Sequence, residues 1–224
     1  MYFLIKYMDD LNLVIITTAV QSLTSHTCFT SDMRFLQIMR TILSVHEKIP
    51  NPYIVILDTG TMTLEQSKCI RPYVKEINNM EAFTLSKNGG EIMMLFTYFT
   101  SENFAKLLPS VSTINKLSGR YFLTERFEFK KHDVTKNLIK LNFDHNSGAR
   151  IEGRYFRIPS KRFQYFIDHF KEFVQKVVSE NLFDKMSIEE SMFQYKVFEL
   201  EQSVYTQHLG VGGHFACVGR YNED

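Results

Sequence analysis

The stretch INKLSGRYFL, residues 114–123, indicates a buried strand that ends in a glycine turn and then resumes in apolar residues. Two cations, Lys116 and Arg120, flank the Ser118-Gly119 pair at the break. Cations at this spacing suit an anion-binding site, because a guanidinium grips oxygens in pairs and a glycine lets the backbone approach closely. The plainer interpretation puts both cations on a solvated edge and makes Gly119 an ordinary bulge. The spacing alone leaves both interpretations open.

The chain before this stretch alternates predicted strands and helices. Continuous apolar runs at 12–20 (NLVIITTAV) and 53–57 (YIVIL) are typical of central parallel strands that are covered on both faces. A third short strand is predicted at 82–85. The predicted helices are 33–47 with a cap at Ser31 or Asp32, 64–77 with a Thr63/Gln66 capping box and a kink or break at Pro72, and 92–100 after a glycine turn at 87–91, followed by a short amphipathic piece at 102–107.

The chain after the stretch favours antiparallel strands and then helices. A hairpin is predicted from 137–143 and 150–158, with its turn at 146–148. Strand character returns at 204–218. Ser160 is predicted to cap the longest helix, whose apolar stripe is made of Phe163, Phe166, Ile167, Phe170, Val174, Val177 and Val178. A further helix is predicted at 188–198, with a capping box of Ser187 and Glu190.

This order of elements predicts an α/β fold: an open, mixed sheet flanked by helices, in a single domain over 1–224. No linker-like segment divides the chain. In open α/β sheets, ligands bind beyond the carboxyl ends of the strands. The predicted strand ends would bring hydroxyls, a carboxylate, a glycine loop and a cationic turn to one crevice. These groups are Thr17 and Thr18, Asp58 and Thr59, Asn88, Gly89 and Gly90, and Ser118, Gly119 and Arg120.

Composition excludes several classes of protein. Among 224 residues, 26 Lys and Arg against 25 Asp and Glu leave a formal charge of +1, so a nucleic-acid partner, which calls for a basic excess, is not expected. No apolar run is long enough to span a bilayer, and residues 1–16 make a poor signal peptide. The three well-separated cysteines, Cys28, Cys69 and Cys217, suggest a reducing compartment. A cytoplasmic protein without a transmembrane segment is therefore predicted.

Several segments together resemble a known family. VIITTAV (14–20), RFLQIMRTILS (34–44) and YIVILDTGT (53–61) look like the opening of GT-A glycosyltransferases. The later segments are similar to GT-A-like enzymes of large DNA viruses and bacteria: NGGE (88–91), KLSGRYFL (116–123), SIEESMF (187–193) and LGVGGHFACVG (209–219). KLSGRYFL is the sharpest of these segments.

The resemblance implies a GT-A-like (Rossmann-like) fold with a nucleotide-binding half at about 10–125 and an acceptor half at about 126–224. It also implies transfer of a sugar from a nucleoside-diphosphate-sugar donor to a hydroxyl of a glycan or glycoprotein, in the host cytoplasm if the protein is viral. In that scheme Thr17 and Thr18, at the end of the first strand, hold the nucleoside together with Asp58 and Thr59. Asn88 to Gly90 hold the sugar or diphosphate, beside Ser118 and Gly119.

One departure from the family bears on metal dependence. Metal-dependent GT-A enzymes carry an Asp-x-Asp near the end of the fourth strand, where this chain has Leu117-Ser118-Gly119-Arg120. Lys116 and Arg120 would then neutralise the leaving diphosphate. Mn²⁺ or Mg²⁺ held by Asp58, Glu91 or another carboxylate stays open. The histidines show no zinc-ligand spacing.

An inverting transfer needs a carboxylate that deprotonates the acceptor hydroxyl. Glu190 is the third residue after Ser187 and has a capping role there, so Glu189 is the predicted base. A carboxylate favoured by the helix dipole is the plainer role for Glu189.

Two alternatives remain beside sugar transfer. A sugar-phosphate nucleotidyltransferase would carry a glycine-rich, cationic loop after the first strand, and residues 21–30 contain no glycine, lysine or arginine. A non-catalytic nucleotide- or glycan-binding module is the other, and the missing Asp-x-Asp keeps it open. Fold alone does not choose among the three.

Overall fold

The fold is described from a computed structural model. The residues it describes are 11–21, 28–60, 62–80, 87–144, 148–180, 192, 195–214 and 221–222. Side chains are not described at 87–88, 141–144, 148–153, 214 and 222.

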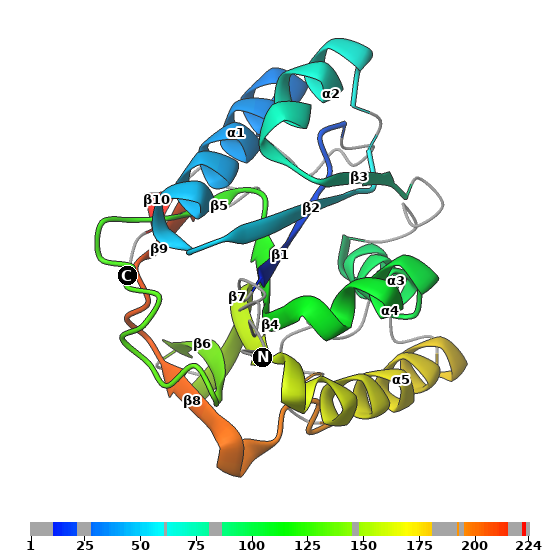
Figure 1. The fold of residues 1–224 in the computed structure, drawn as a ribbon, viewed down its shortest axis with the longest axis vertical. Helices are drawn as coiled ribbons and strands as arrows, with labels where there is room; N and C mark the ends of the chain where they lie inside the picture. Colours follow the sequence, from blue (N-terminus) through cyan, green and yellow to red (C-terminus); the bar gives the residue numbers. More distant parts are fainter. Residues whose placement is uncertain are drawn as a thin grey trace, which may run out of the picture.

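A seven-stranded sheet runs through the molecule in the order β3-β2-β1-β4-β7-β6-β8 (Figure 1). Four of its six neighbouring pairs are parallel, and β7 is antiparallel to both of its neighbours. The predicted α/β fold with an open mixed sheet is therefore confirmed. The strands are β1 (Leu11–Thr18), β2 (Pro52–Asp58), β3 (Glu76–Asn79), β4 (Val111–Ser118), β6 (Asn137–Asp144), β7 (Gly148–Pro159) and β8 (Ser203–Thr206).

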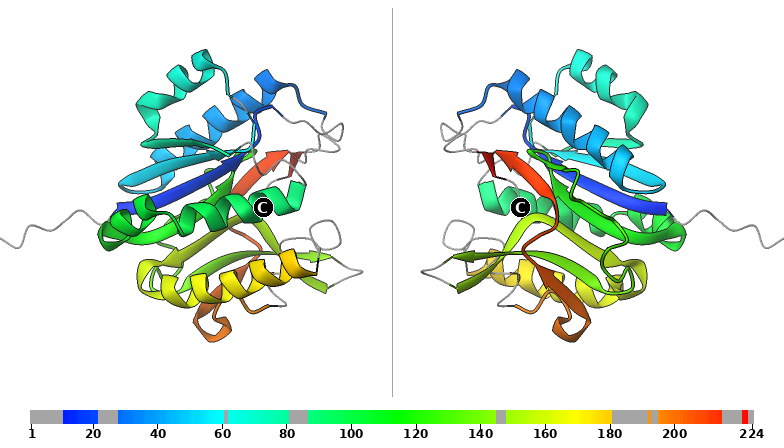
Figure 2. Two further views of the ribbon diagram at one scale, coloured as in Figure 1. Left: turned by 90° about the vertical axis from the view of Figure 1, so that its right-hand side faces the viewer. Right: turned by 90° about the vertical axis from the view of Figure 1, so that its left-hand side faces the viewer.

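Helices cover both faces of this sheet (Figures 1 and 2). On one face, α1 (Ser31–Lys48) and α2 (Leu64–Ile70) pack on the side chains of β1 and β2 that include Val14, Ile16 and Ile56. On the other face, α3 (Lys87–Phe99), α4 (Glu102–Leu107) and α5 (Phe163–Ser179) pack on Leu13, Ile15 and Val55. Burial on both faces explains why these strands are continuous apolar runs.

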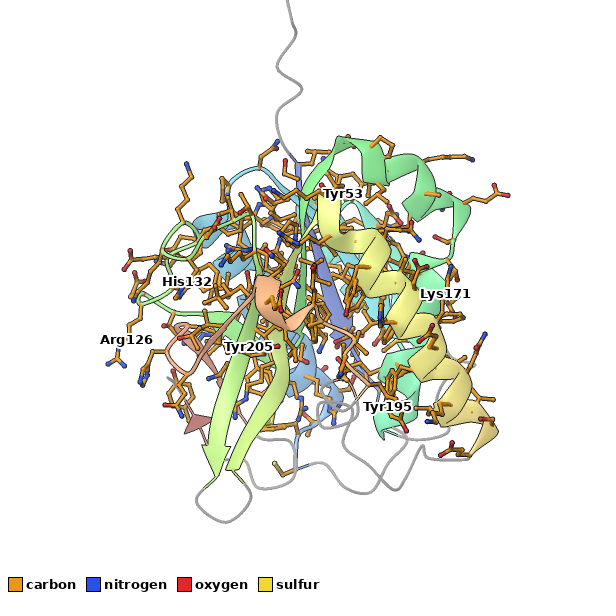
Figure 3. The ribbon with its side chains drawn as sticks, turned by 90° about the horizontal axis from the view of Figure 1, so that it is seen from below. Tyr53, Arg126, His132, Lys171, Tyr195 and Tyr205 are labelled. Atoms are coloured by element: carbon orange, nitrogen blue, oxygen red, sulfur yellow. The ribbon has the colours of Figure 1, made fainter. Side chains whose placement is uncertain are left out.

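The predicted apolar stripe of α5 is buried except for Val178, which is exposed, and Phe173 belongs to it as well. The ring of Phe173 lies 5.5 Å from that of Tyr195, between ring centres, so Tyr195 (labelled in Figure 3) packs back on the helix. The predicted cap at Ser160 is wrong, because a 3₁₀ turn at Ser160–Arg162 precedes α5 and the Ser160 side chain makes no cap. At 17 residues, α5 is also one residue shorter than α1.

Other element boundaries also differ from the predictions. The Thr63/Gln66 capping box is confirmed, but α2 ends at Ile70 and a 3₁₀ turn containing Pro72 follows. The third strand is β3 at Glu76–Asn79, inside the segment predicted as helix; the predicted strand at 82–85 lies outside the described residues. Thr30, rather than Ser31 or Asp32, caps α1.

The stretch 114–123 divides between two sheets. Its first part is the end of β4, and its second part is β5 (Tyr121–Leu123), which pairs with β9 (Val211–His214) and not with the main sheet. β10 (Tyr221–Asn222) completes this three-stranded sheet. The helix α1 fixes it in place: the Thr41 hydroxyl donates to the Tyr121 carbonyl at 2.7 Å, and the Leu123 N–H donates to the Ser44 hydroxyl at 3.0 Å.

Candidate functional site

The main sheet reverses its strand order between β1 and β4. From β1 the chain adds β2 and then β3 on one side, and afterwards crosses back to place β4 on the other side of β1 (Figure 1). In open α/β sheets the crevice at such a switch point, outside the carboxyl ends of the strands, is where ligands bind. The register aligns polar residues along this edge, pairing Thr17 with Ser118, Thr18 with Asp58, and Asp58 with Asn79.

A hydrogen-bonded cluster lies at this switch point, on the face covered by α3. Glu91 of α3 accepts a hydrogen bond from the Thr17 hydroxyl at 2.6 Å, and the same oxygen is 2.5 Å from the Lys116 ammonium. Lys116 also donates to the Ser118 hydroxyl at 3.0 Å, and that hydroxyl lies 3.5 Å from Glu91. Lys116 is therefore not in bulk solvent: its side chain is 2% exposed, against 25% for Glu91.

Strand alternation puts these groups on one face. Along β4, Ile114, Lys116 and Ser118 project to the same side, and along β1, Leu13, Ile15 and Thr17 do so. On this face Leu13, Ile15 and Ile114 are apolar and packed in the core, and the polar residues Thr17, Lys116 and Ser118 follow them toward the ends of the strands. The polar groups that contact Glu91 therefore lie toward the carboxyl edge of this face.

Opposing influences set the ionisation of Glu91. Burial is the largest of them and by itself raises the pKa of a carboxyl group. The charge and hydrogen bond of Lys116, the hydroxyl of Thr17 and the charge of Arg120 outweigh it, so the pKa of Glu91 is held below its usual value. At neutral pH Glu91 is therefore a carboxylate.

The face covered by α1 carries the second group of predicted residues. Asp58 is 1% exposed, and one of its oxygens accepts the Val20 N–H at 3.0 Å. The Thr59 N–H donates to the Thr18 carbonyl at 3.0 Å. These bonds hold the chain as it leaves β1 and β2. The predicted single crevice is therefore two adjoining groups: Thr17, Ser118 and Lys116 on one face, and Thr18, Asp58 and Thr59 at the ends of the strands on the other.

Gly119 allows the chain to cross from one sheet to the other. Its N–H donates to the Thr17 carbonyl at 2.8 Å, so this N–H serves the fold and not an anion. A Cβ at this position would meet Thr18, Ile16 and Ile38 side-chain atoms at 3.1–3.3 Å. Arg120 follows Gly119, between β4 and β5. It is half-buried, and its guanidinium lies 5.7 Å from the centre of the Tyr121 ring.

The remaining predicted site residues have different outcomes. The segment 87–91 is not a turn before a helix at 92; α3 begins at Lys87, so Asn88, Gly89 and Gly90 form its first turn, and both glycines are buried. The side chain of Asn88 is not described. Glu189, the predicted base, lies outside the described residues, as does the predicted Ser187/Glu190 capping box.

The structure adds two arginines that the sequence reasoning missed. Arg34, in the first turn of α1, donates to the Ala19 carbonyl at 2.6 Å, just beyond β1. Arg154 of β7 is 5% exposed, and its guanidinium lies 4.9 Å from the centre of the Tyr121 ring. A cation in the first turn of a helix opposes the helix dipole, and this was the available signal for Arg34.

No group of three or more His, Cys, Asp or Glu side chains that could hold a metal ion occurs among the described residues. Asp58 and Glu91, the two carboxylates named as possible ligands of a divalent cation, lie on opposite faces of the sheet and contact different partners. These two side chains therefore do not form a common ligand set.

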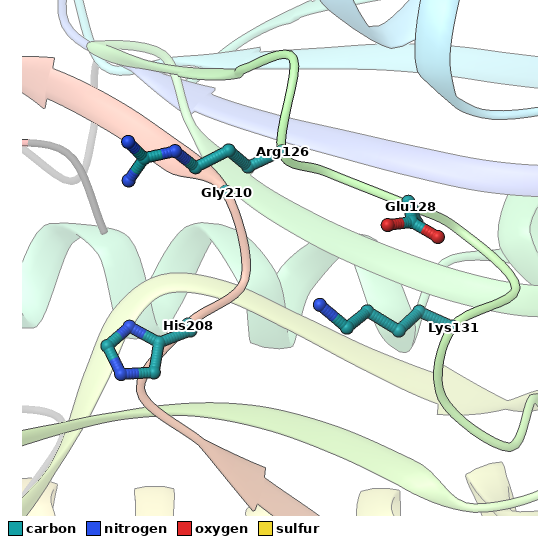
Figure 4. Close-up of a pocket in the computed structure, with 5 residues that line it drawn as sticks. All are labelled: Arg126, Glu128, Lys131, His208 and Gly210. Carbon is teal, nitrogen blue, oxygen red and sulfur yellow. The ribbon is translucent and has the colours of Figure 1, made fainter.

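A hollow lies between the segment after β5 and the segment before β9 (Figure 4). Its volume is about 370 Å³, and Arg126, Glu128, Lys131, His208 and Gly210 line it. Arg157 stabilises the loop that carries Lys131. It is fully buried and donates to the carbonyls of Phe129, His132 and Asp133.

Among the helices that the structure describes, none combines the length and apolar character needed to cross a lipid bilayer. Neither a scan against protein-family models nor a search of curated proteins found a significant match to this sequence. What the molecule establishes by itself is an α/β fold with a mixed seven-stranded sheet and a charged cluster at its switch point.

Proposed function

We propose that this protein is a GT-A-like glycosyltransferase, which moves a sugar from a nucleoside-diphosphate-sugar to a hydroxyl of a glycan or glycoprotein. The observation that carries the proposal is the position of the Thr17–Glu91–Lys116–Ser118 cluster at the carboxyl edge between β1 and β4. This is the crevice in which α/β folds with a parallel 3-2-1-4 strand order bind nucleotides. The segment KLSGRYFL, which carries the sharpest family resemblance, contains two members of the cluster.

The geometry refines the roles expected for the two cations. Because Lys116 is paired with Glu91 at 2.5 Å, its charge is largely compensated, and its role is to hold the crevice in shape. Arg120 is half-buried and forms no ion pair with the residues that the structure describes, so it is the better source of positive charge for the departing diphosphate. Thr18 and Asp58 would lie beside the nucleoside, and the first turn of α3 beside the sugar or diphosphate. Glu189 remains the proposed base.

The test is turnover of a panel of nucleotide sugars, measured as release of the nucleoside diphosphate, in Mn²⁺, in Mg²⁺ and in EDTA. Slow hydrolysis of one donor is expected. Arg120→Ala should lower that turnover by about 10²-fold or more, the cost of a lost charge contact in the transition state. Arg71→Ala, which removes the same charge from an exposed turn outside the site, is the matched control and should leave turnover unchanged.

Three results would contradict the proposal. Absence of turnover with every donor, together with donor binding, indicates a binding module. Pyrophosphate release from a sugar phosphate and a nucleoside triphosphate indicates a nucleotidyltransferase. Full activity of Arg120→Ala would remove the leaving-group role. Glu189→Gln should abolish transfer to an acceptor while donor affinity stays within about twofold of wild type, because a base acts on the acceptor hydroxyl.

A further inference from the structure

Arg34 occupies an unfavourable place for a cation. It lies in the first turn of α1, where the helix dipole repels positive charge, and it is only partly exposed. One of its terminal nitrogens donates to the Ala19 carbonyl, while its Nε atom is buried with no hydrogen-bond acceptor among the described residues. A buried donor left in this way costs free energy unless a ligand or water accepts from it.

A second guanidinium, that of Arg120, lies near enough to influence the charge of Arg34. Ile38 is one helical turn after Arg34 on the same side of α1, and a Cβ at Gly119 would lie 3.2 Å from its side chain. Arg120 follows Gly119 in the chain. Arg34 of α1 and Arg120 of the turn after β4 are therefore close to the same edge of the sheet. Burial is the largest influence lowering the pKa of Arg34, and the charge of Arg120 is the next, while Asp58 and Cys28 oppose it.

The charges at this edge do not balance. Lys116 and Glu91 compensate each other at 2.5 Å. Among the described residues, the charge of Arg34 is then influenced by one further guanidinium, that of Arg120, and by one carboxylate, that of Asp58, which also accepts the Val20 N–H. Two like charges held together at a partly buried edge are stabilised by an anion that accepts from both. A guanidinium presents paired donors that match the oxygens of phosphate groups.

We propose that Arg34 and Arg120 together form a clamp for a diphosphate group, with each guanidinium donating to the phosphate oxygens. The inference rests on the proposed function for the identity of the ligand, the diphosphate of a nucleotide sugar. It adds a residue from the first helix to a site otherwise built from strand ends and α3. Since Arg34 also holds the Ala19 carbonyl, occupation of the clamp also couples to the chain after β1.

Inorganic pyrophosphate is the probe, titrated calorimetrically against wild type, Arg34→Gln, Arg34→Lys, Arg120→Gln and the control Arg71→Gln, with inorganic phosphate as the comparison ligand. Wild type should bind pyrophosphate more tightly than phosphate. Arg34→Gln and Arg120→Gln should each weaken pyrophosphate binding about 10-fold or more, because a partner of a desolvated charge contact is lost. Arg34→Lys should restore only part of the affinity, since lysine offers a point charge and no fork. Arg71→Gln should bind as wild type does.

Thermal unfolding of each unliganded variant checks that a loss of binding is not a loss of fold. The clamp is wrong if wild type does not bind pyrophosphate, or if Arg34→Gln binds it as tightly as Arg71→Gln does; the second result would direct attention to the hollow lined by Arg126 and Lys131. Failure of the clamp and failure of the proposed function are distinguishable. Pyrophosphate binding that depends on Arg34 without turnover of any nucleotide sugar supports the clamp alone, whereas turnover that depends on Arg120 but not on Arg34 supports the transferase alone.

Discussion

Replacing Lys116 by methionine tests whether the stability of the fold depends on the ion pair at the switch point. Methionine keeps most of the apolar stem and removes the charge. At 2.5 Å and an effective dielectric constant of about 20, the attraction between Lys116 and Glu91 is about 7 kcal/mol, and desolvation of the two groups offsets several kcal/mol for each ion. What the substitution exposes is the cost of leaving the carboxylate without its partner, about 3–5 kcal/mol for a fully buried pair.

The exposure of Glu91 lowers that figure. Its side chain is 25% exposed, so water can reach the orphaned carboxylate and the lower limit of about 3 kcal/mol applies. In a chain of this length each kcal/mol shifts the melting temperature by about 2–4 °C, so Lys116→Met should melt about 6–12 °C below wild type. Urea unfolding at pH 7 gives the free energy directly.

A double-mutant cycle separates the pair from the individual side chains. With Lys116→Met, Glu91→Gln and the double variant, the coupling free energy should be about 2 kcal/mol, and the double variant should be more stable than Lys116→Met. The same cycle on the exposed pair Lys106 and Glu102, whose charged atoms are 3.7 Å apart, is the control and should give about 0.3–0.5 kcal/mol. A coupling below about 0.5 kcal/mol at the buried pair would refute the reasoning.

Three further predictions concern pH, a buried hydroxyl and a glycine. Because the pKa of Glu91 is lower in the folded protein than in the unfolded chain, its stabilisation is complete above the unfolded value of about 4.3 and is lost as the pH falls through the folded value. Between pH 6 and pH 3 the unfolding free energy of Glu91→Gln should therefore fall less than that of wild type, while Glu102→Gln follows wild type; parallel curves for wild type and Glu91→Gln would contradict this. Thr41→Val should lower the unfolding free energy by about 1–3 kcal/mol, because it removes a fully buried donor to β5, and an unchanged urea midpoint would show that this bond is dispensable. Gly210→Ala should cost more than Gly119→Ala, since Gly210 has a φ of +71° and its added Cβ would lie 2.3 Å from a backbone nitrogen, against 3.1 Å from a side-chain carbon at Gly119; equal costs in urea unfolding would refute the assignment.

The central strands were predictable because their signal is local. β1 and β2 are buried on both faces, so nearly every position is apolar and the pattern is visible in the sequence alone. β3 was missed because it is a four-residue strand, Glu-Ile-Asn-Asn, with no fully buried residue. Its only partner in the main sheet is β2, and that pairing fixes it as a strand where its own residues do not.

The candidate site, too, was predictable only in part. The strand-end rule placed Thr17, Asp58 and Ser118 at one edge, and the register confirms their alignment. The rule did not assign these residues to the two faces of the sheet. Side chains alternate between the faces along a strand, so that assignment depends on the face to which the first residue of each strand points. The partner of Lys116 was not predictable either, because Glu91 is 25 positions earlier and reaches Lys116 only through the packing of α3 on the sheet.

The division of the stretch 114–123 between two sheets has a consequence for folding during synthesis. β4 can pair with β1 as soon as it is made, but the partner of β5 is β9, at residues 211–214. While the ribosome translates the intervening residues, β5 can already form its hydrogen bonds with α1, through Thr41 and Ser44. The hydroxyls of Thr41 and Ser44 thus hold β5 against α1. This keeps the unpaired edge of β5 from pairing with another chain until β9 has been made.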